Sequence, residues 1–246
     1  MPLKASPEDQ AVLLDLQAID TKLQQLAHKA NSLPELATIA SLTAEAEEAR
    51  RAGVGDSGAL EDAQTELKRV ESDVEVVEAR IKRDTERLET TSSVKDVAGL
   101  EAELSSLRKR QSDLEDIELA VMERIEELEL AASTSSALHD ELRVKLSEEE
   151  ASRDAGLATI GGERDHALAN RVELVGKLPP ELVALYERQR ERYGTGASML
   201  RGGVSSASGV RLNESDMAAI RAAAPDDVVL CPDSNAILVR TAESGI

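Results

Sequence analysis

Aromatic residues are almost absent from this chain of 246 residues. It contains no Phe and no Trp, and its two Tyr are Tyr186 and Tyr193. A globular core of this size normally uses aromatic rings to fill its volume. Their scarcity, together with 31% charged residues, is typical of long helices that pack along narrow seams.

Other residue types are scarce too, and each absence excludes a class of protein. A single cysteine, Cys231, excludes an intramolecular disulfide framework. No apolar run approaches the length of a membrane span, so we expect a cytoplasmic protein without membrane contact. The formal net charge of −19 disfavours general binding of nucleic acid or anionic membranes, because both are polyanions.

The middle of the chain contains two runs in which apolar residues recur at steps of three and four. The runs span residues 67–88 and 100–128, and each places its apolar side chains on one helical stripe. Between them, Thr90-Thr91-Ser92-Ser93 is made of poor helix formers. This pattern predicts a mainly α fold, in which residues 1–178 form a long antiparallel coiled-coil hairpin with its tip near residues 90–95.

Two stretches of weak helix formers interrupt this pattern. One is the glycine-rich segment 52–58, and the other is Ser133-Thr134-Ser135-Ser136. With the tip near residue 93, the two stretches are expected to lie opposite each other. We predict a break in each helix there, which is either a shared hinge or a tolerated loop.

The last third of the chain changes character after a predicted linker helix at residues 179–196, which Pro180 can start. Residues 197–246 then contain short apolar pieces at strand spacing, and Asn213 is placed to cap a brief helix. This predicts a small C-terminal αβ module. Such a module rarely stabilises itself without a metal, a disulfide or a larger partner surface. The predicted strands are 210–212, 228–230 and 237–239.

Four positions in this module have the spacing of a metal site. Ser205 and Ser208 lie on one loop, and Cys231 and Ser234 lie on another, with 22 residues between the two pairs. Four cysteines at these positions would be the two CxxC knuckles of a zinc ribbon. Cys231 is the one cysteine at these four positions.

At this point the chain resembles a known family, the bacterial C4-type zinc-ribbon proteins with a long N-terminal coiled-coil hairpin. The resemblance covers nearly the whole chain and rests on four segments. They are SSVKDVAGLEAELSSLRKRQSDLED, ELAVMERIEELE, LPPELVALYERQRERYGTGAS and the frame LRGGVSSASGVRL with VVLCPDSNAILVRT. The resemblance implies that positions 205, 208, 231 and 234 are the family's zinc ligands, so that zinc is the cofactor expected in the family.

The departure from four cysteines argues against zinc in this chain. Serine hydroxyls at neutral pH are poor substitutes for thiolates, so we predict no metal and no other cofactor. Packing must then replace part of the stabilisation that a metal supplies. We expect a zinc-ribbon-like module with a small apolar core, docked against the helix around residues 182–193. The expected core residues are Val204, Val210, Leu212, Met217, Ile220, Val229, Ile237 and Val239.

No catalytic constellation is evident in the sequence. His28, His139 and His166 are far apart on helices, and Cys231 has no obvious His partner. The many Glu residues are expected on a solvated helical surface, and the phosphate-loop signature is missing. We therefore predict that the chain is not an enzyme.

Basic residues gather in two places. One set near the tip contains Lys95, Arg108, Lys109 and Arg110, and the other, at the linker, contains Arg188, Arg190, Arg192 and Arg201. They either alternate with Glu as intrahelical ion pairs or form docking ends for an acidic protein or RNA. Tyr186 and Tyr193 could stack on bases near the second set.

These features favour a coiled-coil adaptor or scaffold that binds a protein partner. The resemblance implies a role near transcription, secretion or RNA handling. The alternative is a regulatory protein that binds RNA or DNA through the Arg-rich linker and the zinc-ribbon-like module. Spare apolar positions such as Ile39, Ile117 and Met122 also allow a homodimer through the coiled coil.

Overall fold

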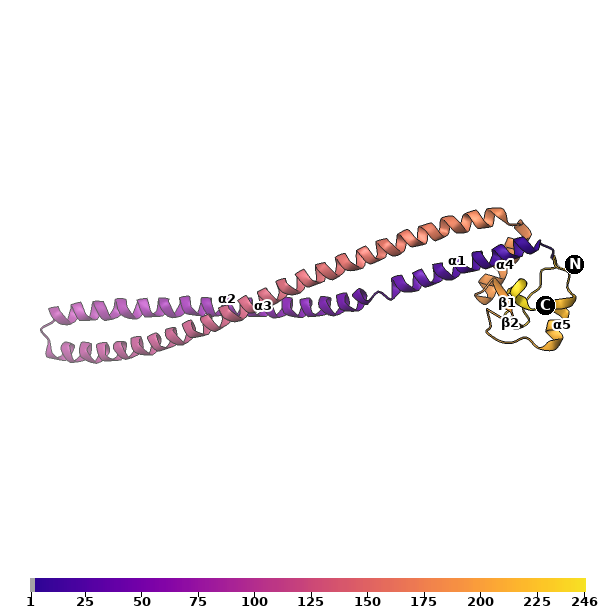
Figure 1. Ribbon diagram of the computed structural model, residues 1–246. Helices are drawn as coiled ribbons and strands as arrows, with labels where there is room; N and C mark the ends of the chain where they lie inside the picture. Colours follow the sequence, from indigo (N-terminus) through magenta and orange to yellow (C-terminus); the bar gives the residue numbers. More distant parts are fainter. Residues whose placement is uncertain (1–2) are drawn as a thin grey trace. The chain divides into compact units, whose positions relative to one another are not determined.

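The computed structural model describes residues 3–246 (Figure 1). It divides into two compact units: the hairpin unit, Glu35–Ala151, and the terminal unit, Met1–Pro34 with Ser152–Ile246. In chain order the elements are α1 (Pro7–Asn31), α2 (Pro34–Thr90), α3 (Val94–Lys177), α4 (Pro180–Tyr193), β1 (Ala197–Arg201), β2 (Val204–Ser205), α5 (Glu214–Ala222), β3 (Ile237–Val239) and the 3-10 turn η1 (Ala242–Ser244). Among these residues, no helix is both long and apolar enough to cross a membrane.

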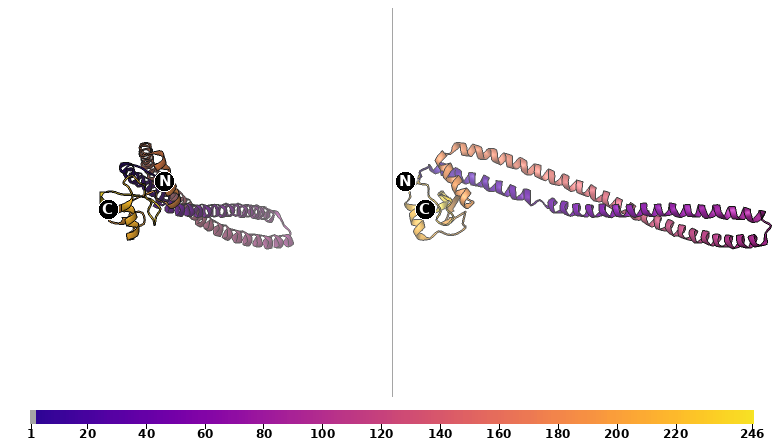
Figure 2. Two further views of the ribbon diagram at one scale, coloured as in Figure 1. Left: turned by 90° about the vertical axis from the view of Figure 1, so that its right-hand side faces the viewer. Right: turned by 180° about the vertical axis from the view of Figure 1, so that it is seen from behind.

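In the hairpin unit, α2 and α3 run antiparallel and side by side in every view (Figures 1 and 2). They are joined by residues 91–93, so the predicted hairpin and its tip are confirmed. The buried side chains follow the predicted steps of three and four, because one stripe from each helix meets in the seam. They include Ala46, Ala49, Ala63 and Val77 on α2, and Leu100, Leu104, Leu114, Val121 and Leu142 on α3.

The two breaks predicted in the hairpin do not occur, because α2 is helical through residues 52–58 and α3 through residues 133–136. Three of these residues, Gly53, Asp56 and Ser135, lie at seam positions, where small side chains suit a close approach of the helices. An added Cβ on Gly53 would lie 3.7 Å from Cβ of Ser135, and the Ser135 hydroxyl donates a hydrogen bond to Asp56. Packing along the seam therefore outweighs the low helix propensity of these residues.

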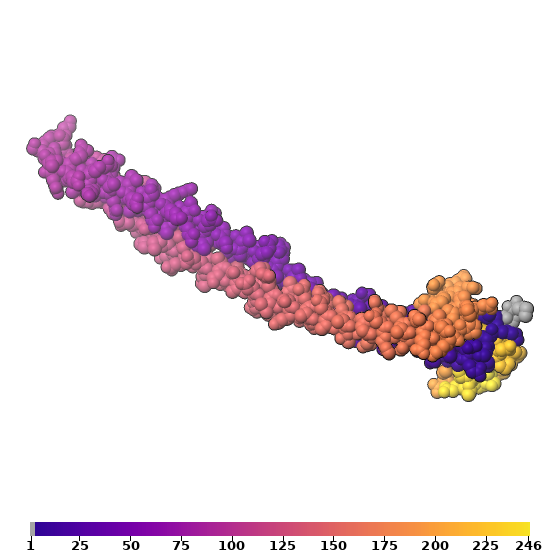
Figure 3. Space-filling model, turned by 90° about the horizontal axis from the view of Figure 1, so that it is seen from above, coloured from indigo at the N-terminus to yellow at the C-terminus, as the bar shows by residue number. Residues whose placement is uncertain are grey.

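The terminal unit is built around α1. The backbone N–H of Asp9 donates to Oγ of Ser6 at 3.0 Å, and Pro7 opens the helix. Just after this helix, Leu33 lies against α3, 3.6 Å from the position that a Cβ on Gly156 would take. Figure 3 shows the indigo N-terminal residues in contact with the orange and yellow segments of this unit.

A three-stranded sheet in the order β2-β1-β3 completes the terminal unit. Strand β1 pairs antiparallel with β2 through a turn at Gly202 and Gly203, whose φ angles of 54° and 80° suit glycine, and parallel with β3. The prediction of strands was partly wrong. Residues 210–212 and 228–230 make single β-bridges, and the central strand is β1, whose Ala-Ser-Met-Leu-Arg sequence has little β propensity.

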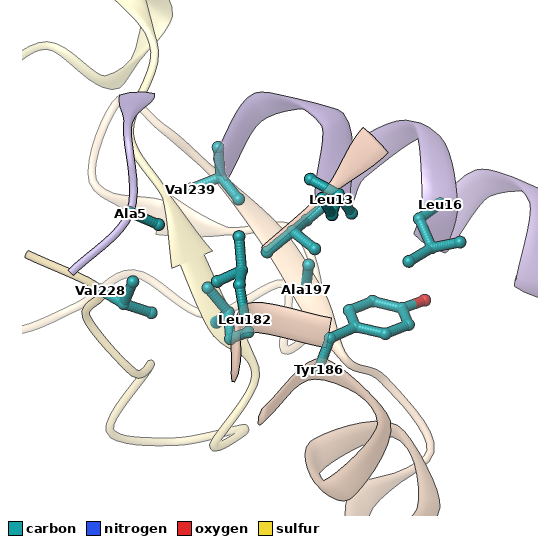
Figure 4. Close-up of a cluster of buried hydrophobic side chains, with 10 residues drawn as sticks. Ala5, Leu13, Leu16, Leu182, Tyr186, Ala197, Val228 and Val239 are labelled. Atoms are coloured by element: carbon teal, nitrogen blue, oxygen red, sulfur yellow. The ribbon is translucent and has the colours of Figure 1, made fainter. Parts of the chain in front are cut away.

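Two apolar clusters stabilise this unit. The larger one joins α1, α4 and the sheet, and Figure 4 shows Leu13 and Leu16 facing Leu182 and Tyr186 across it. The smaller one contains Leu200, Leu212, Met217, Ile220, Cys231 and Leu238. The predicted core was therefore too small: it omitted α1, and it included Val210, which is 53% exposed.

Candidate functional site

A buried polar network ties α1 to α3 and α4 in the terminal unit. Its centre is Asp20, whose side chain is 3% exposed. The carboxylate accepts hydrogen bonds from the Tyr186 hydroxyl at 2.7 Å and from Nε and Nη2 of Arg171 at 2.7 and 3.2 Å. Arg171 also pairs with Glu187. These residues, with Gln17 and Arg190, are called the junction network below.

Gln17 extends the junction network to the sheet. Its Oε1 accepts hydrogen bonds from the backbone N–H groups of Gly196 and Ala197 at 2.8 and 3.2 Å, where β1 begins. Burial, followed by the hydrogen bond to Asp20, raises the pKa of Tyr186 well above its usual value. The phenol therefore stays protonated and acts as a fixed donor. Since its groups are satisfied by one another, the network holds three helices and a strand in place rather than offering a reactive group.

Most of the predicted basic residues at the linker interact with other residues of this chain. Arg190 pairs with Glu187 at 2.8 Å and lies 3.5 Å from Asp20. Arg201 pairs with Glu243 at 3.1 Å, and Arg192 lies over the ring of Tyr193. Arg188 is exposed, with no ion pair among the described residues. Of these four arginines, Arg190 thus belongs to the buried junction network, Arg201 forms an ion pair and Arg192 contacts an aromatic ring.

The four predicted ligand positions come together only in part. Ser205 and Cys231 are fully buried, and hydrogen bonds from Ser234 and Ser205 reach the thiol. Burial raises the pKa of Cys231, but these hydrogen bonds outweigh it and leave the pKa below its usual value. Oγ of Ser208 instead accepts a hydrogen bond from the backbone N–H of Val210 at 3.2 Å. One thiol and three hydroxyls do not make the donor set of a structural zinc site.

The predicted basic residues of the tip are placed differently from those of the linker. Lys95, Arg108, Lys109 and Arg110 are all exposed on α3, and no ion pair is described for them within residues 3–246. Residues 80–110 contain eight basic and six acidic side chains, whereas residues 111–151 contain three basic and thirteen acidic ones. The tip is therefore the basic part of an acidic hairpin.

Sequence reasoning missed two buried acids, Asp20 and Asp84, although a signal was present. Both occupy positions at which the step of three and four calls for an apolar residue: Asp20 follows Leu13 and Leu16, and Asp84 follows Val77 and Ile81. A charged residue at a seam position is either paired or exposed to a partner. Asp20 is paired, whereas Oδ2 of Asp84 is buried without a hydrogen-bond partner.

Comparison with known proteins agrees with this architecture. Two uncharacterized Mycobacterium tuberculosis proteins, from strains CDC 1551 and H37Rv, are each 37% identical to the chain over 239 residues, which is 97% of this chain and 98% of theirs. A solved Mycobacterium smegmatis structure matches with a TM-score of 0.87 and 36% identity, over 97% of this chain and 100% of that one.

A more distant structure and a family model match as well. CT398 from Chlamydia trachomatis shares the fold, with a TM-score of 0.65 at 19% identity over 95% of this chain and 98% of that one. Residues 16–194 match the model described as the CT398-like coiled coil hairpin domain. The matched range covers both arms of the hairpin and α4, and on this ground the chain belongs to the CT398-like coiled-coil hairpin family.

Proposed function

We propose that this chain is a non-enzymatic cytoplasmic adaptor whose hairpin presents its basic tip to an acidic protein partner. The observation that carries the proposal is the set of exposed, unpaired cations Lys95, Arg108, Lys109 and Arg110 at the end of a strongly acidic hairpin. Complementary charge steers encounter and selects partners. A partner near transcription, secretion or RNA handling fits the resemblance described above.

The chemistry of the titratable groups supports a role without catalysis. Burial, and then the hydrogen bond to Asp20, raises the pKa of Tyr186, and the hydrogen bond to Asp20 raises the pKa of Arg171. Cys231 lies within an apolar cluster. In surface pairs such as Glu47 with Arg50, the hydrogen bond between the two side chains and their opposite charges lower the pKa of the acid and raise the pKa of the base. These pKa shifts have structural causes, and the described groups that show them are spread over both units of the chain rather than gathered around one hollow.

The proposal predicts that reversing charge at the tip abolishes partner binding. Replacing Arg108, Lys109 and Arg110 with Glu is expected to lower the recovery of specific partner proteins at least about tenfold in affinity purification followed by mass spectrometry. The matched control replaces Lys29, Lys68 and Arg69 with Glu. These residues are exposed but lie away from the tip, and the change in net charge is the same. Equal recovery with both triple variants would remove the tip from the proposal.

Nucleic-acid binding is the second candidate. It is favoured by one observation: Tyr193 is 43% exposed, with the Arg192 guanidinium 5.3 Å from its ring centroid. Together with exposed Arg188 this pair could stack on a base and contact a phosphate. Tyr186, by contrast, is buried and bonded to Asp20. Binding of single-stranded RNA and of duplex DNA, measured across a salt series, tests this candidate, because phosphate contacts alone fade steeply with salt.

We further propose that the C-terminal module is a zinc ribbon that has lost its metal and is held by packing. Cys231 belongs to the smaller apolar cluster, and hydrogen bonding from Ser234 and Ser205 lowers the pKa of its thiol. The purified protein is therefore expected to contain far less than one zinc ion per chain, and a strong chelator should leave its unfolding midpoint unchanged. Metal analysis by mass spectrometry checks this; a near-stoichiometric zinc content would contradict it.

A further inference from the structure

One side of the hairpin tip is hollowed along its length. Two adjoining hollows, of about 550 and 360 Å³, share Arg87 and Glu103 in their linings and so form one groove between α2 and α3. Its other charged residues include Arg80, Arg83, Asp84 and Lys95. This surface is called the tip groove. Gly99 also lines it, and nothing lies within 4 Å of the position that a Cβ there would take.

An unsatisfied carboxylate lies in the tip groove. Asp84 is 6% exposed because it occupies the seam position between Ile81 and Leu88. Its Oδ1 lies 3.5 Å from Nη1 of Arg87, while Oδ2 is buried and has no hydrogen-bond partner among residues 3–246. Burying an unpaired carboxylate oxygen is unfavourable unless a donor arrives. This oxygen is therefore an acceptor that a group from outside the chain can satisfy once the side chains that cover it turn aside.

The cations around Asp84 form a regular array. Arg80, Arg83 and Arg87 follow one another at steps of three and four, which places them on one face of α2. Arg80 is bound to Glu103, whereas Arg83 and Lys95 are exposed and have no ion pair among the described residues. Asp96, which also lines the groove, is exposed and has no ion pair among the described residues, so two of the three free charges of the groove are positive. Their attraction favours a ligand that carries carboxylates.

We infer that the tip groove binds an acidic α-helix of a partner protein. Carboxylates of that helix meet Arg83 and Lys95, and one neutral hydrogen-bond donor, such as Gln or Ser, meets Oδ2 of Asp84 once the side chains that cover this oxygen turn aside. A neutral donor fits better than a cation, because Arg80, Arg83 and Arg87 line the same hollow as Asp84 and repel another positive charge. The groove between two packed helices accepts a third helix by ridge-into-groove packing, and Gly99 leaves room for its backbone.

This inference rests on the proposed function and specifies the partner and the side of the tip that it uses. The probe is a synthetic alanine-based helix of about 20 residues, long enough to be helical alone, with Glu at steps of three and four and one central Gln on the same face. Its binding to the full chain is measured by fluorescence anisotropy at low and physiological salt. A peptide with every Glu replaced by Gln is the control ligand.

Two pairs of substitutions separate the groove from general tip charge. Replacing Arg83 and Lys95 with Glu is expected to weaken binding of the acidic peptide about tenfold, whereas the same change at Arg69 and Lys82, which are exposed and do not line the groove, should alter it less than about threefold. Equal losses from both pairs would overturn the groove while leaving a basic tip intact. Equally tight binding of the Gln peptide, of single-stranded RNA, or no binding at all would overturn it too.

Asp84 supplies a test that a merely structural residue would fail. Asp84→Leu is expected to raise the unfolding midpoint of the hairpin, because it removes from the seam a buried carboxylate of which one oxygen has no donor, and yet to weaken peptide binding about tenfold. Asp84→Asn keeps an acceptor oxygen and should stay within about threefold of the natural chain. If Asp84→Leu binds the peptide as well as the natural chain does, Asp84 has no part in docking and the inference fails.

Discussion

Replacing Asp20 with Ala is expected to lower the free energy of unfolding of the terminal unit by about 3 kcal/mol or more. The change leaves the buried Tyr186 hydroxyl without its acceptor at 2.7 Å and removes two hydrogen bonds from Arg171. A buried group that loses its partner bears its full desolvation penalty. Arg171 keeps Glu187, so the loss should fall at the lower end of the range for broken buried ion pairs.

Tyrosine signals allow this loss to be measured in the terminal unit. Both tyrosines, Tyr186 and Tyr193, lie in this unit, so near-UV circular dichroism during urea unfolding reports on it selectively. Asp15→Ala is the matched control, because Asp15 is exposed on the same helix, and it should change stability by less than about 0.5 kcal/mol. Similar small effects from both variants would show that the junction network is not stabilising.

A double-mutant cycle identifies the contact responsible. Tyr186→Phe alone is expected to lower stability by about 1–2 kcal/mol, because it removes the hydroxyl from a buried carboxylate while keeping the ring in the apolar cluster. In the Asp20→Ala variant, Tyr186→Phe should lower the free energy of unfolding much less, because the hydrogen bond is already lost. Additive losses would instead mean that the two side chains act independently.

The hairpin could be predicted because its information is local and repeated. Steps of three and four recur along both arms, and Thr90 to Ser93 end them with residues of poor helix propensity, so the fold and the tip follow from a single pattern. The glycine-rich stretch misled the same reasoning. Propensity is a weak term, and Gly53 and Asp56 lie on the seam, where contact with Ser135 compensates for it.

The parts that could not be predicted depend on contacts between distant segments. Strand β1 has little β propensity and is ordered by its parallel partner β3 and by α1, with pairings such as Ala197 with Ile237. The same holds for the basic residues: periodicity cannot distinguish Arg190, which lies beside Asp20, from Arg188, which stays exposed. The exposed cations of the tip could be identified from the sequence. The groove beside them could not, because it depends on how α2 and α3 are aligned along each other.

Replacing Gly196 with Ala is expected to lower the stability of the terminal unit by about 3 kcal/mol, at the upper end of the range for overpacking. An ideal Cβ at this position would lie 2.5 Å from Cε2 and 2.6 Å from Cδ2 of Tyr186. The ring is fully buried and held by Asp20, so it cannot move aside easily. The backbone is equally fixed, since Gly196 N–H donates to Gln17 and its carbonyl accepts from Ile237 N–H.

Two other glycines show whether the loss comes from this contact. Gly162→Ala, in α3 with nothing within 4 Å of the added Cβ, should stabilise the chain by about 0.5–1 kcal/mol because it favours the helix. Gly194→Ala, at φ 83° and also with open space around it, should lose about 1 kcal/mol through backbone strain alone. Gly196 has no such φ, so backbone strain does not add to its loss of stability. If Gly196→Ala loses more stability than Gly194→Ala, and if this loss shrinks when Tyr186 is replaced by Leu, the effect comes from the ring. A loss at Gly196 no larger than at Gly194 would mean that α4 and β1 can separate, and that the junction network does not fix the sheet against the helices.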